Sequence, residues 1–188
     1  RYDALRLGSQ AVSYQGISSN MQVSGAGLVG TGGTGDYTEG ASSIESIIAE
    51  GYAEFEVGAN QDVLVGLSAN GKASQHYSDM AYSFYVLDAN LYVYEDGVGR
   101  GAIGIGQNTE GARLRILLEN GKVHYQIKQA NEAGFRTLYT STKTLDQSTA
   151  YYADATLRYT GSKVKYMGLG TKDSFADTTS TKTRYVYD

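Results

Sequence analysis

Glu54 and Glu56 are the pair of carboxylates whose spacing comes nearest to that of a hydrolase. Residues two apart on a strand point to the same face, and glycosidases use two carboxylates about 5 to 10 Å apart across a cleft. Glutamate is also a common residue on a solvated strand face. We therefore expect a solvated face here, with a polysaccharide-active enzyme as the alternative.

Histidine and cysteine offer little further chemistry. The chain has two His, His76 and His124, and no Cys. Two isolated His do not predict a transition-metal site. His76 stands in a Ser-Gln-His-Tyr-Ser-Asp run, but catalytic triads are assembled by the fold and seldom from residues this close in sequence. These observations predict a protein that is not an enzyme.

Hard oxygen ligands occur in two turns. Asp88 and Asn90 flank one, and Glu95 and Asp96 begin the other. Calcium prefers such oxygens, yet no run has the spacing of a calcium loop, and turn chemistry explains Asp and Asn equally well. We expect no cofactor, and name these four residues as the candidates if calcium binds.

Tyrosine is the strongest compositional signal, with 17 Tyr and no Trp. A Tyr ring can stack on a sugar while its hydroxyl forms hydrogen bonds. Tyr92 and Tyr94 share one strand face; Tyr82 or Tyr85 on the preceding strand would extend the stripe, and Arg115 would add donors beside it. The alternative is that these rings pack into the protein, because Tyr is a common strand residue.

A polar segment supplies the loop candidates, which are His76, Tyr77 and Asp79. Binding residues are often found on loops that a rigid scaffold positions. The sugar-binding candidates are therefore the strand residues Tyr85, Tyr92, Tyr94 and Arg115 together with these three loop residues.

The elements that must position these residues are strands. Apolar and other residues alternate with a period of two over residues 51–57, 81–87, 90–95, 113–118 and 123–128, which is typical of half-buried strands. Asn120-Gly121 between two such runs predicts a hairpin, and residues 88–90 predict another. With weaker candidates, about ten to thirteen strands are expected, as in a sandwich or barrel.

Two segments are less regular. Residues 42–50 are short and rich in β-branched residues, so we favour a strand or a single turn over a helix. Residues 25–40 are rich in Gly and Thr, and we expect an exposed loop there. The stretch of residues 25–35 lacks the Gly-Lys-Ser/Thr ending of a phosphate-binding loop.

Length and charge exclude several classes of protein. A chain of 188 residues without Cys is long enough for one domain with a core of its own. The net charge is −4, whereas a nucleic-acid-binding protein needs a basic face, so nucleic-acid binding is not expected. No apolar run approaches the roughly 18 residues of a membrane span, so membrane insertion is not expected. Because residue 1 is Arg and no leader is evident, we expect a processed piece of a longer protein.

The order of four segments resembles a known fold family. They read VGLSANGKASQHYSDMAYSFYVLDANLYVYEDGVGRG, GARLRILLENGKVHYQI, TLYTST and YYADATLRYTGSKV. This layout resembles concanavalin-like jelly-roll modules of bacterial surface and secreted proteins, related to lectin, laminin-G and SPRY sandwiches, over roughly residues 11 to 169. Residues 128–134 form a longer loop than in those modules, and the E-x-D-x-x-E motif of jelly-roll glycosidases is absent.

The resemblance implies an antiparallel all-β sandwich that recognises glycans or proteins. We expect one sandwich over residues 1–170, and a polar segment with a terminal strand over residues 171–188 that packs on it or on another chain. The predicted function is non-catalytic binding of glycans on a cell surface or extracellular polymer, as in an adhesin or lectin, outside a bacterial cell. The alternative is a structural or protein-interaction domain, such as a homotrimeric fibre tip without a sugar site.

Overall fold

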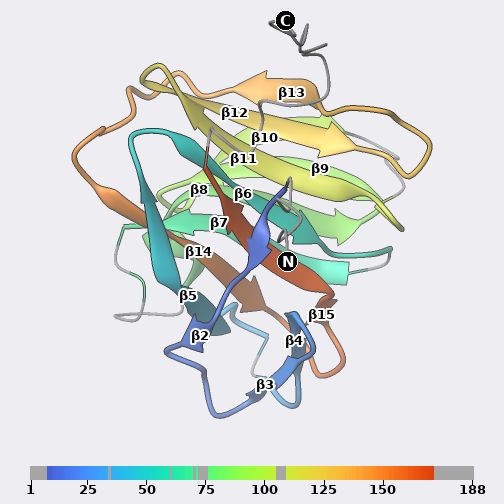
Figure 1. Ribbon diagram of the computed structural model, residues 1–188. Coiled ribbons are helices and arrows are strands. Elements are labelled where there is room, and N and C mark those ends of the chain that lie inside the picture. Colours follow the sequence, from blue (N-terminus) through green and yellow to red (C-terminus); the bar gives the residue numbers. More distant parts are fainter. Residues whose placement is uncertain are drawn as a thin grey trace, which may run out of the picture.

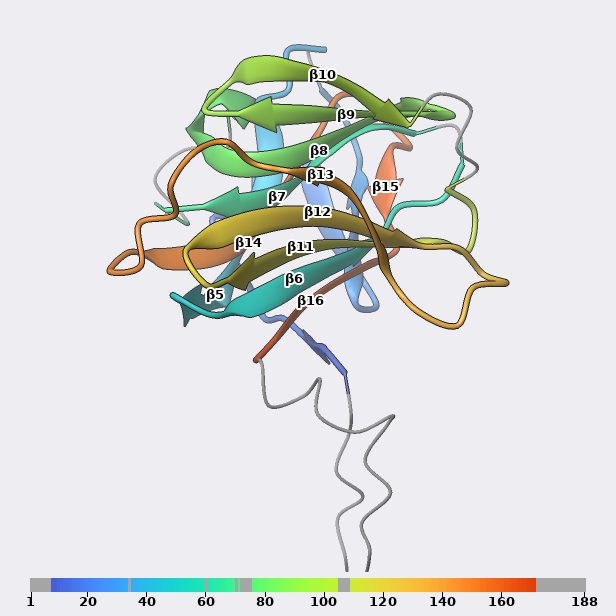
Figure 2. The ribbon, with the colours of Figure 1, turned by 90° about the horizontal axis from the view of Figure 1, so that it is seen from above.

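Two antiparallel sheets packed face to face make up the protein (Figures 1 and 2). The computed structural model describes residues 8–33, 35–59, 61–69, 71, 76–104 and 109–171. Within that part of the chain, no helix is long and apolar enough to cross a membrane. The expected antiparallel β-sandwich is confirmed.

One layer is a six-stranded sheet in the order β1-β16-β6-β11-β12-β13. Every pairing in it is antiparallel. Its strands are β1 (Gln10–Ala11), β6 (Gly51–Glu56), β11 (Arg113–Glu119), β12 (Lys122–Lys128), β13 (Arg136–Thr140) and β16 (Tyr166–Gly170).

The other layer is a seven-stranded sheet in the order β10-β9-β8-β7-β14-β5-β2. Figure 2 shows β10, β9, β8 and β7 stacked across from β12, β11 and β6. Its strands are β2 (Tyr14–Gln15), β5 (Glu39–Ile48), β7 (Gln61–Ser68), β8 (Met80–Asp88), β9 (Asn90–Glu95), β10 (Val98–Gly104) and β14 (Ala150–Leu157).

Two small elements complete the fold. A three-stranded sheet of β3 (Met21–Ser24), β4 (Gly27–Gly30) and β15 (Lys163–Val164) lies at one end of the sandwich (Figure 1). A short 3-10 turn, η1 (Tyr77–Asp79), leads directly into β8.

The core lies between the two large sheets, where the inward-facing side chains of both sheets meet. Ile116 and Tyr125 of one sheet and Val65 and Phe84 of the other are fully buried. Phe84 and Tyr125 meet across the sheets edge to face, with ring centroids 5.2 Å apart, an arrangement that stabilises aromatic pairs beyond their buried area. The period-two alternation in the sequence is the direct cause of this layer.

Both predicted hairpins are confirmed. Asn120 and Gly121 adopt φ values of 51° and 72° between β11 and β12, as a two-residue turn of the primed type requires. Asp88, with φ 52°, turns the chain between β8 and β9. Residues 42–50 fall largely in β5, which confirms the strand over the helix.

Two expectations differ from the structure. The predicted exposed loop over residues 25–40 is wrong in part, because Gly27 and Gly30 are buried in β4, where a Cβ atom at either position would press against the backbone of residues 159–165. Strand β10 was not expected, since its Gly-rich, exposed edge lacks alternation. The terminal strand expected within residues 171–188 lies outside the described residues.

Candidate functional site

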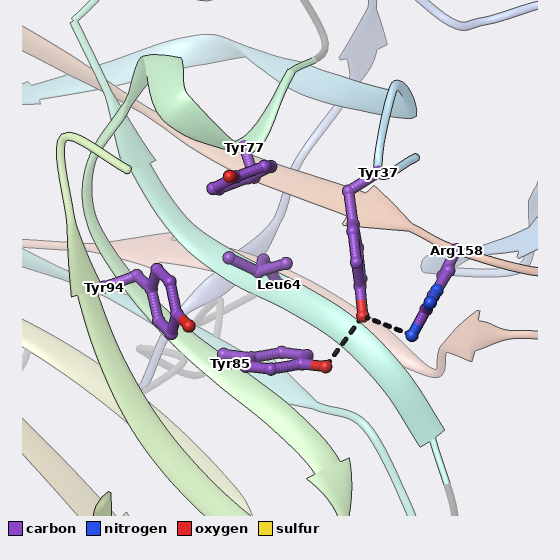
Figure 3. Close-up of a pocket in the computed structure, with 6 residues that line it drawn as sticks. All are labelled: Tyr37, Leu64, Tyr77, Tyr85, Tyr94 and Arg158. Atoms are coloured by element: carbon purple, nitrogen blue, oxygen red, sulfur yellow. Dashed lines mark hydrogen bonds between the residues drawn. The ribbon is translucent and has the colours of Figure 1, made fainter. Parts of the chain in front are cut away.

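A cavity of about 220 Å³ opens on the outer face of the seven-stranded sheet, away from the core. Figure 3 shows four tyrosine rings around it, with an apolar side chain at the base and a guanidinium at the rim. Its lining residues are Tyr37, Leu64, Tyr77, Tyr85, Tyr94 and Arg158.

The four rings form a box, which we call the tyrosine box: Tyr37, Tyr77, Tyr94 and Tyr85 in order around the cavity. Neighbouring ring centroids lie 6.0, 6.3, 5.6 and 5.7 Å apart, and the corresponding planes meet at 74°, 81°, 89° and 87°. Each wall is therefore nearly perpendicular to the next. In Figure 3 the ring faces turn toward the space above Leu64.

Three of the residues come from neighbouring strands by simple alternation. Val63 and Val65 of β7 point into the core, so Leu64 points outward. Leu64 pairs with Tyr85 of β8, and Tyr85 pairs with Tyr92 of β9. Tyr94 lies two residues farther along β9, on the same face as Tyr92. Side chains that face the same way on adjacent strands lie within contact distance. The sheet therefore fixes the base and two walls of the box.

Tyr77 closes the box from η1. His76 caps this turn by accepting a hydrogen bond from the Ser78 amide through Nδ1, and its ring lies 4.6 Å from that of Tyr77. Gly97, with φ 75°, allows Ser78 to approach closely, because a Cβ there would lie 3.0 Å from Ser78. The β9–β10 turn and the histidine cap together place Tyr77 over the sheet.

A hydrogen-bond network holds the walls on the Arg158 side. Tyr37 Oη donates to Asp62 Oδ1, and Tyr85 Oη lies 2.7 Å from Tyr37 Oη. Because a phenol has one proton and a carboxylate only accepts, Tyr85 donates to Tyr37. Arg158 Nη1 donates to Asp62 Oδ2 at 3.0 Å and to Tyr37 Oη at 3.3 Å. Because Tyr85 donates to Tyr37 and Tyr37 donates to Asp62, both rings have little freedom to turn.

Burial sets the protonation of these groups. Desolvation raises the pKa of Tyr37 well above its ordinary value, and the hydrogen bond to Asp62 raises that pKa further. Desolvation likewise raises the pKa of Tyr85. The hydrogen bond to Asp62 raises the pKa of Arg158. Both phenols are neutral over the physiological range, and the Asp62–Arg158 pair carries no net charge.

A second, polar hollow of about 470 Å³ lies beside the first, with Asp62 between the two. Tyr159 stands at it with 47% of its surface exposed, and the Arg158 guanidinium lies 4.8 Å from its ring centroid. We call this the polar hollow; its lining residues are Gln61, Asp62, Leu87, Asp88, Tyr159, Thr160, Gly161 and Ser162.

The structure brings several sequence candidates together. Tyr77, Tyr85 and Tyr94 line one cavity, and Tyr92 lies against Tyr85 with centroids 5.7 Å apart. His76 supports Tyr77 from behind. Asp79 is exposed at the end of η1 and does not line the cavity.

Arg115 is not beside this stripe, and that expectation is wrong. It belongs to β11 of the other sheet, where its Nε donates to Glu54 Oε1 at 2.9 Å. The expectation of a solvated face at Glu54 is also wrong, since Glu54 is 8% and Arg115 9% exposed. A buried carboxylate needs a partner, and Ser9 Oγ provides a second donor at 2.7 Å.

The four candidate calcium ligands lie apart. Asp88 and Asn90 stand at one end of β9, and Glu95 and Asp96 at the other. Glu95 is fully buried and accepts hydrogen bonds from Tyr125 and Arg100, both at 3.2 Å. Within the described residues, no three His, Asp or Glu side chains lie close enough to hold a metal ion.

Sequence reasoning missed Tyr37, Leu64 and Arg158. Tyr37 lies in the Gly-rich segment taken for an exposed loop, and its φ of 52° is unusual for a residue with a side chain. Leu64 sits within a continuous apolar run whose faces alternation does not distinguish. Arg158 directly follows β14. Only their meeting in space identifies them.

Comparison with known proteins finds similarity of fold. No protein-family model and no curated protein match the chain. The TRIM65 PSpry domain is 15% identical, with a TM-score of 0.58 over 85% of this chain and 92% of that one. A winged bean acidic lectin complexed with methyl-alpha-D-galactose is 8% identical, with a TM-score of 0.54 over 87% and 93%. A Bacillus licheniformis beta-glucanase is 10% identical, with a TM-score of 0.50 over 82% and 83%.

Structural similarity at identities this low shows the fold alone and leaves the activity open, because one fold hosts many functions. SPRY domains, lectins and a glucanase share the sandwich described above. The chain therefore has the concanavalin-like jelly-roll fold.

Proposed function

We propose that this protein is a non-catalytic recognition module that binds a glycan of a cell surface or extracellular polymer. The observation that carries the proposal is the pairing of the tyrosine box with the polar hollow on one sheet face. Ligand sites combine apolar, aromatic walls with a few convergent polar groups. A glycan chain laid across this face would meet both kinds of surface.

The polar hollow suits sugar hydroxyls. Asp88 and Thr160 at its edge are exposed, and they offer a carboxylate and a hydroxyl. Tyr159 offers an exposed ring on which a sugar can stack, since its face and hydroxyl combine apolar contact with hydrogen bonding. Stacking of Arg158 on this ring limits its motion, which lowers the entropy that binding must overcome.

The carboxylates considered for catalysis support binding over hydrolysis. Glu54 is paired with Arg115 inside the protein, and Arg113 lies 3.5 Å from Glu56. A general acid must face a cleft that the substrate can enter, whereas each of these carboxylates is paired with an arginine. Neither residue lines the box or the polar hollow.

A glycan array with the whole chain tests the proposal. We expect binding to at least one polysaccharide class, and a loss of that binding on Tyr159→Ala and on Asp88→Ala. His124→Ala, which changes a ring on the outer face of the opposite sheet, should leave binding unchanged. Glycan binding that survives both hollow variants would place the site elsewhere.

The proposed setting is extracellular, with affinity raised by display of several copies. The alternative is a structural or protein-interaction domain, such as a trimeric fibre tip. A blank array together with a trimer in sedimentation at micromolar concentration would favour that alternative. A monomer across the same range would remove the trimer.

A further inference from the structure

The tyrosine box is closed on four sides, and this shape restricts what it can hold. Neighbouring ring centroids are only 5.6 to 6.3 Å apart, so a group held between the rings lies within the roughly 6 Å over which an aromatic face attracts a cation. A cavity of about 220 Å³ is smaller than the roughly 300 to 1,000 Å³ of sites for larger ligands. The box therefore takes one compact group.

The chemistry of the walls selects a cation without hydrogen-bond donors. Aromatic faces carry negative charge density, and a cation within about 6 Å of a ring centroid is attracted to it. The hydroxyls of Tyr37 and Tyr85 are engaged with each other and with Asp62, so they do not offer a sugar the partners it needs. A trimethylammonium group is round, apolar on its surface and positively charged, and it fits such walls.

The electrostatics around Tyr37 favour the same group. Its hydroxyl donates to the Asp62 carboxylate, which increases the negative charge on the ring face. The Arg158 guanidinium lies 5.1 Å from the Tyr37 ring centroid, is paired with Asp62, and stands beyond Tyr37 at the rim, as Figure 3 shows. Its side chain keeps 34% of its surface exposed, where it can meet an anion that accompanies the cation.

The molecule contains a filled site of related chemistry. The guanidinium carbon of Arg115 lies 4.4 Å from the centroid of Tyr52 and 3.6 Å from that of Phe135. There the chain places its own cation between two aromatic faces. The tyrosine box presents four faces.

We propose that the tyrosine box binds the trimethylammonium group of a phosphocholine-type substituent, with Arg158 facing its phosphate. This inference deepens the proposed function, since it names a substituent that the recognised polymer would carry. The polar hollow beside the box would then contact the polymer itself.

Calorimetric titration of the whole chain with choline, phosphocholine and 3,3-dimethylbutan-1-ol tests the charge requirement. The last compound has the shape of choline without its charge. We expect choline to bind at least about tenfold more tightly than the neutral compound, in line with cation–π attraction to several walls. Phosphocholine should bind more tightly still. Equal binding of choline and the neutral compound, or no binding of choline, would overturn the proposal.

Paired substitutions test the walls. Tyr94→Phe keeps the ring face and should retain choline binding, whereas Tyr94→Leu keeps an apolar side chain and should weaken it about tenfold. Tyr152→Leu is the matched control, because Tyr152 of β14 lies outside the cavity lining and pairs with Ser68, four residues along β7 from Leu64. Tyr77→Leu, on the short turn η1, repeats the test should Tyr94→Leu fail to fold. Equal affinity of the Phe and Leu variants would show that the ring face is not used.

The remaining outcomes separate this inference from the proposed function. A trimethyl-lysine peptide that binds more tightly than phosphocholine would overturn the choline source. Glycan binding that depends on Tyr159, with no response to choline, would overturn the inference and leave the proposed function standing. Choline binding with a blank array of glycans lacking choline would support the inference against the broader proposal.

Discussion

The outer faces of the two sheets both combine aromatic rings with an arginine–carboxylate pair, but in different arrangements. On the six-stranded sheet, Arg115 pairs with Glu54 between Tyr52 and Phe135, nearly sealed from solvent. On the seven-stranded sheet, the Arg158–Asp62 pair stands beside the rings of the tyrosine box, around a cavity. One face fills its aromatic site with its own cation, and the other leaves a cavity between fixed walls.

The contrast separates stability from recognition. A filled, desolvated ion pair cannot lose one partner without leaving the other charge buried. An open site with rigid walls contributes less to folding, but it binds with little loss of side-chain entropy. We therefore expect substitutions of the Arg115–Glu54 pair to change mainly the free energy of unfolding, and substitutions of residues that line the cavity to change mainly binding.

The largest expected effect is on the sealed face. Arg115→Met removes the partner of buried Glu54, and we expect the free energy of unfolding to fall by about 3 to 5 kcal/mol in urea denaturation. Arg113 lies two residues before Arg115 on the same strand and pairs with the more exposed Glu56. Arg113→Met should therefore lower the free energy of unfolding by only about 0 to 1 kcal/mol. Equal losses for the two variants would contradict the distinction between sealed and open pairs.

Mild acid should stabilise the protein through one buried carboxyl group of the seven-stranded sheet. Asp154 pairs with Gly66 of β7, so it shares the outward face with Leu64, and burial raises its pKa from 3.8 to about 7. Between these values the folded protein holds a proton that the unfolded chain has released, so stability is greatest at low pH and falls as pH rises through 7. Lowering the pH from 8 to 5 should raise the free energy of unfolding by about 2 to 3 kcal/mol.

Asp154→Asn isolates that effect. Asp154 Oδ1 has no hydrogen-bond partner among the described residues, and Asn resembles the protonated acid. The variant should be more stable than the natural chain at pH 8, and its unfolding free energy should change less between pH 5 and 8. Urea titrations at both pH values measure the difference, and an unchanged pH dependence would assign it to other groups.

A smaller effect on stability is expected from the hydrogen-bond network beside the tyrosine box. Tyr37→Phe removes the hydroxyl that links Tyr85 to Asp62 but keeps the ring. We expect a loss of about 1 kcal/mol in unfolding free energy and a fall of a few-fold in choline affinity, because the wall becomes mobile. Tyr94→Phe, which removes a hydroxyl outside this network, should change neither quantity comparably.

The smallest effect on stability is expected at the polar hollow. Tyr159→Ala removes an exposed ring, and thermal denaturation should show a change within about 0.5 kcal/mol. The same variant is expected to lose glycan binding. A large loss of stability would mean that this ring serves the fold, as Tyr52 does on the other sheet.

Much of the fold could be predicted because it follows from local rules. The alternation over residues 113–118 and 123–128 and the Asn120-Gly121 turn determined a hairpin that the structure has in register. The outward direction of Tyr92 and Tyr94 followed in the same way. Strand β10 could not be predicted, because its Gly residues have no side chains and so produce no alternation in the sequence.

The sequence by itself determined many of the strands, their alternating faces and the face that Tyr92 and Tyr94 share. Only the tertiary structure decided which sheet each strand joins, and so that Arg115 stands far from the stripe while Tyr37 and Arg158 reach it. The physical reason is that side-chain direction depends on neighbours along the chain. The box instead depends on contacts between residues 37, 77, 94 and 158, which strand pairing and long-range packing bring together.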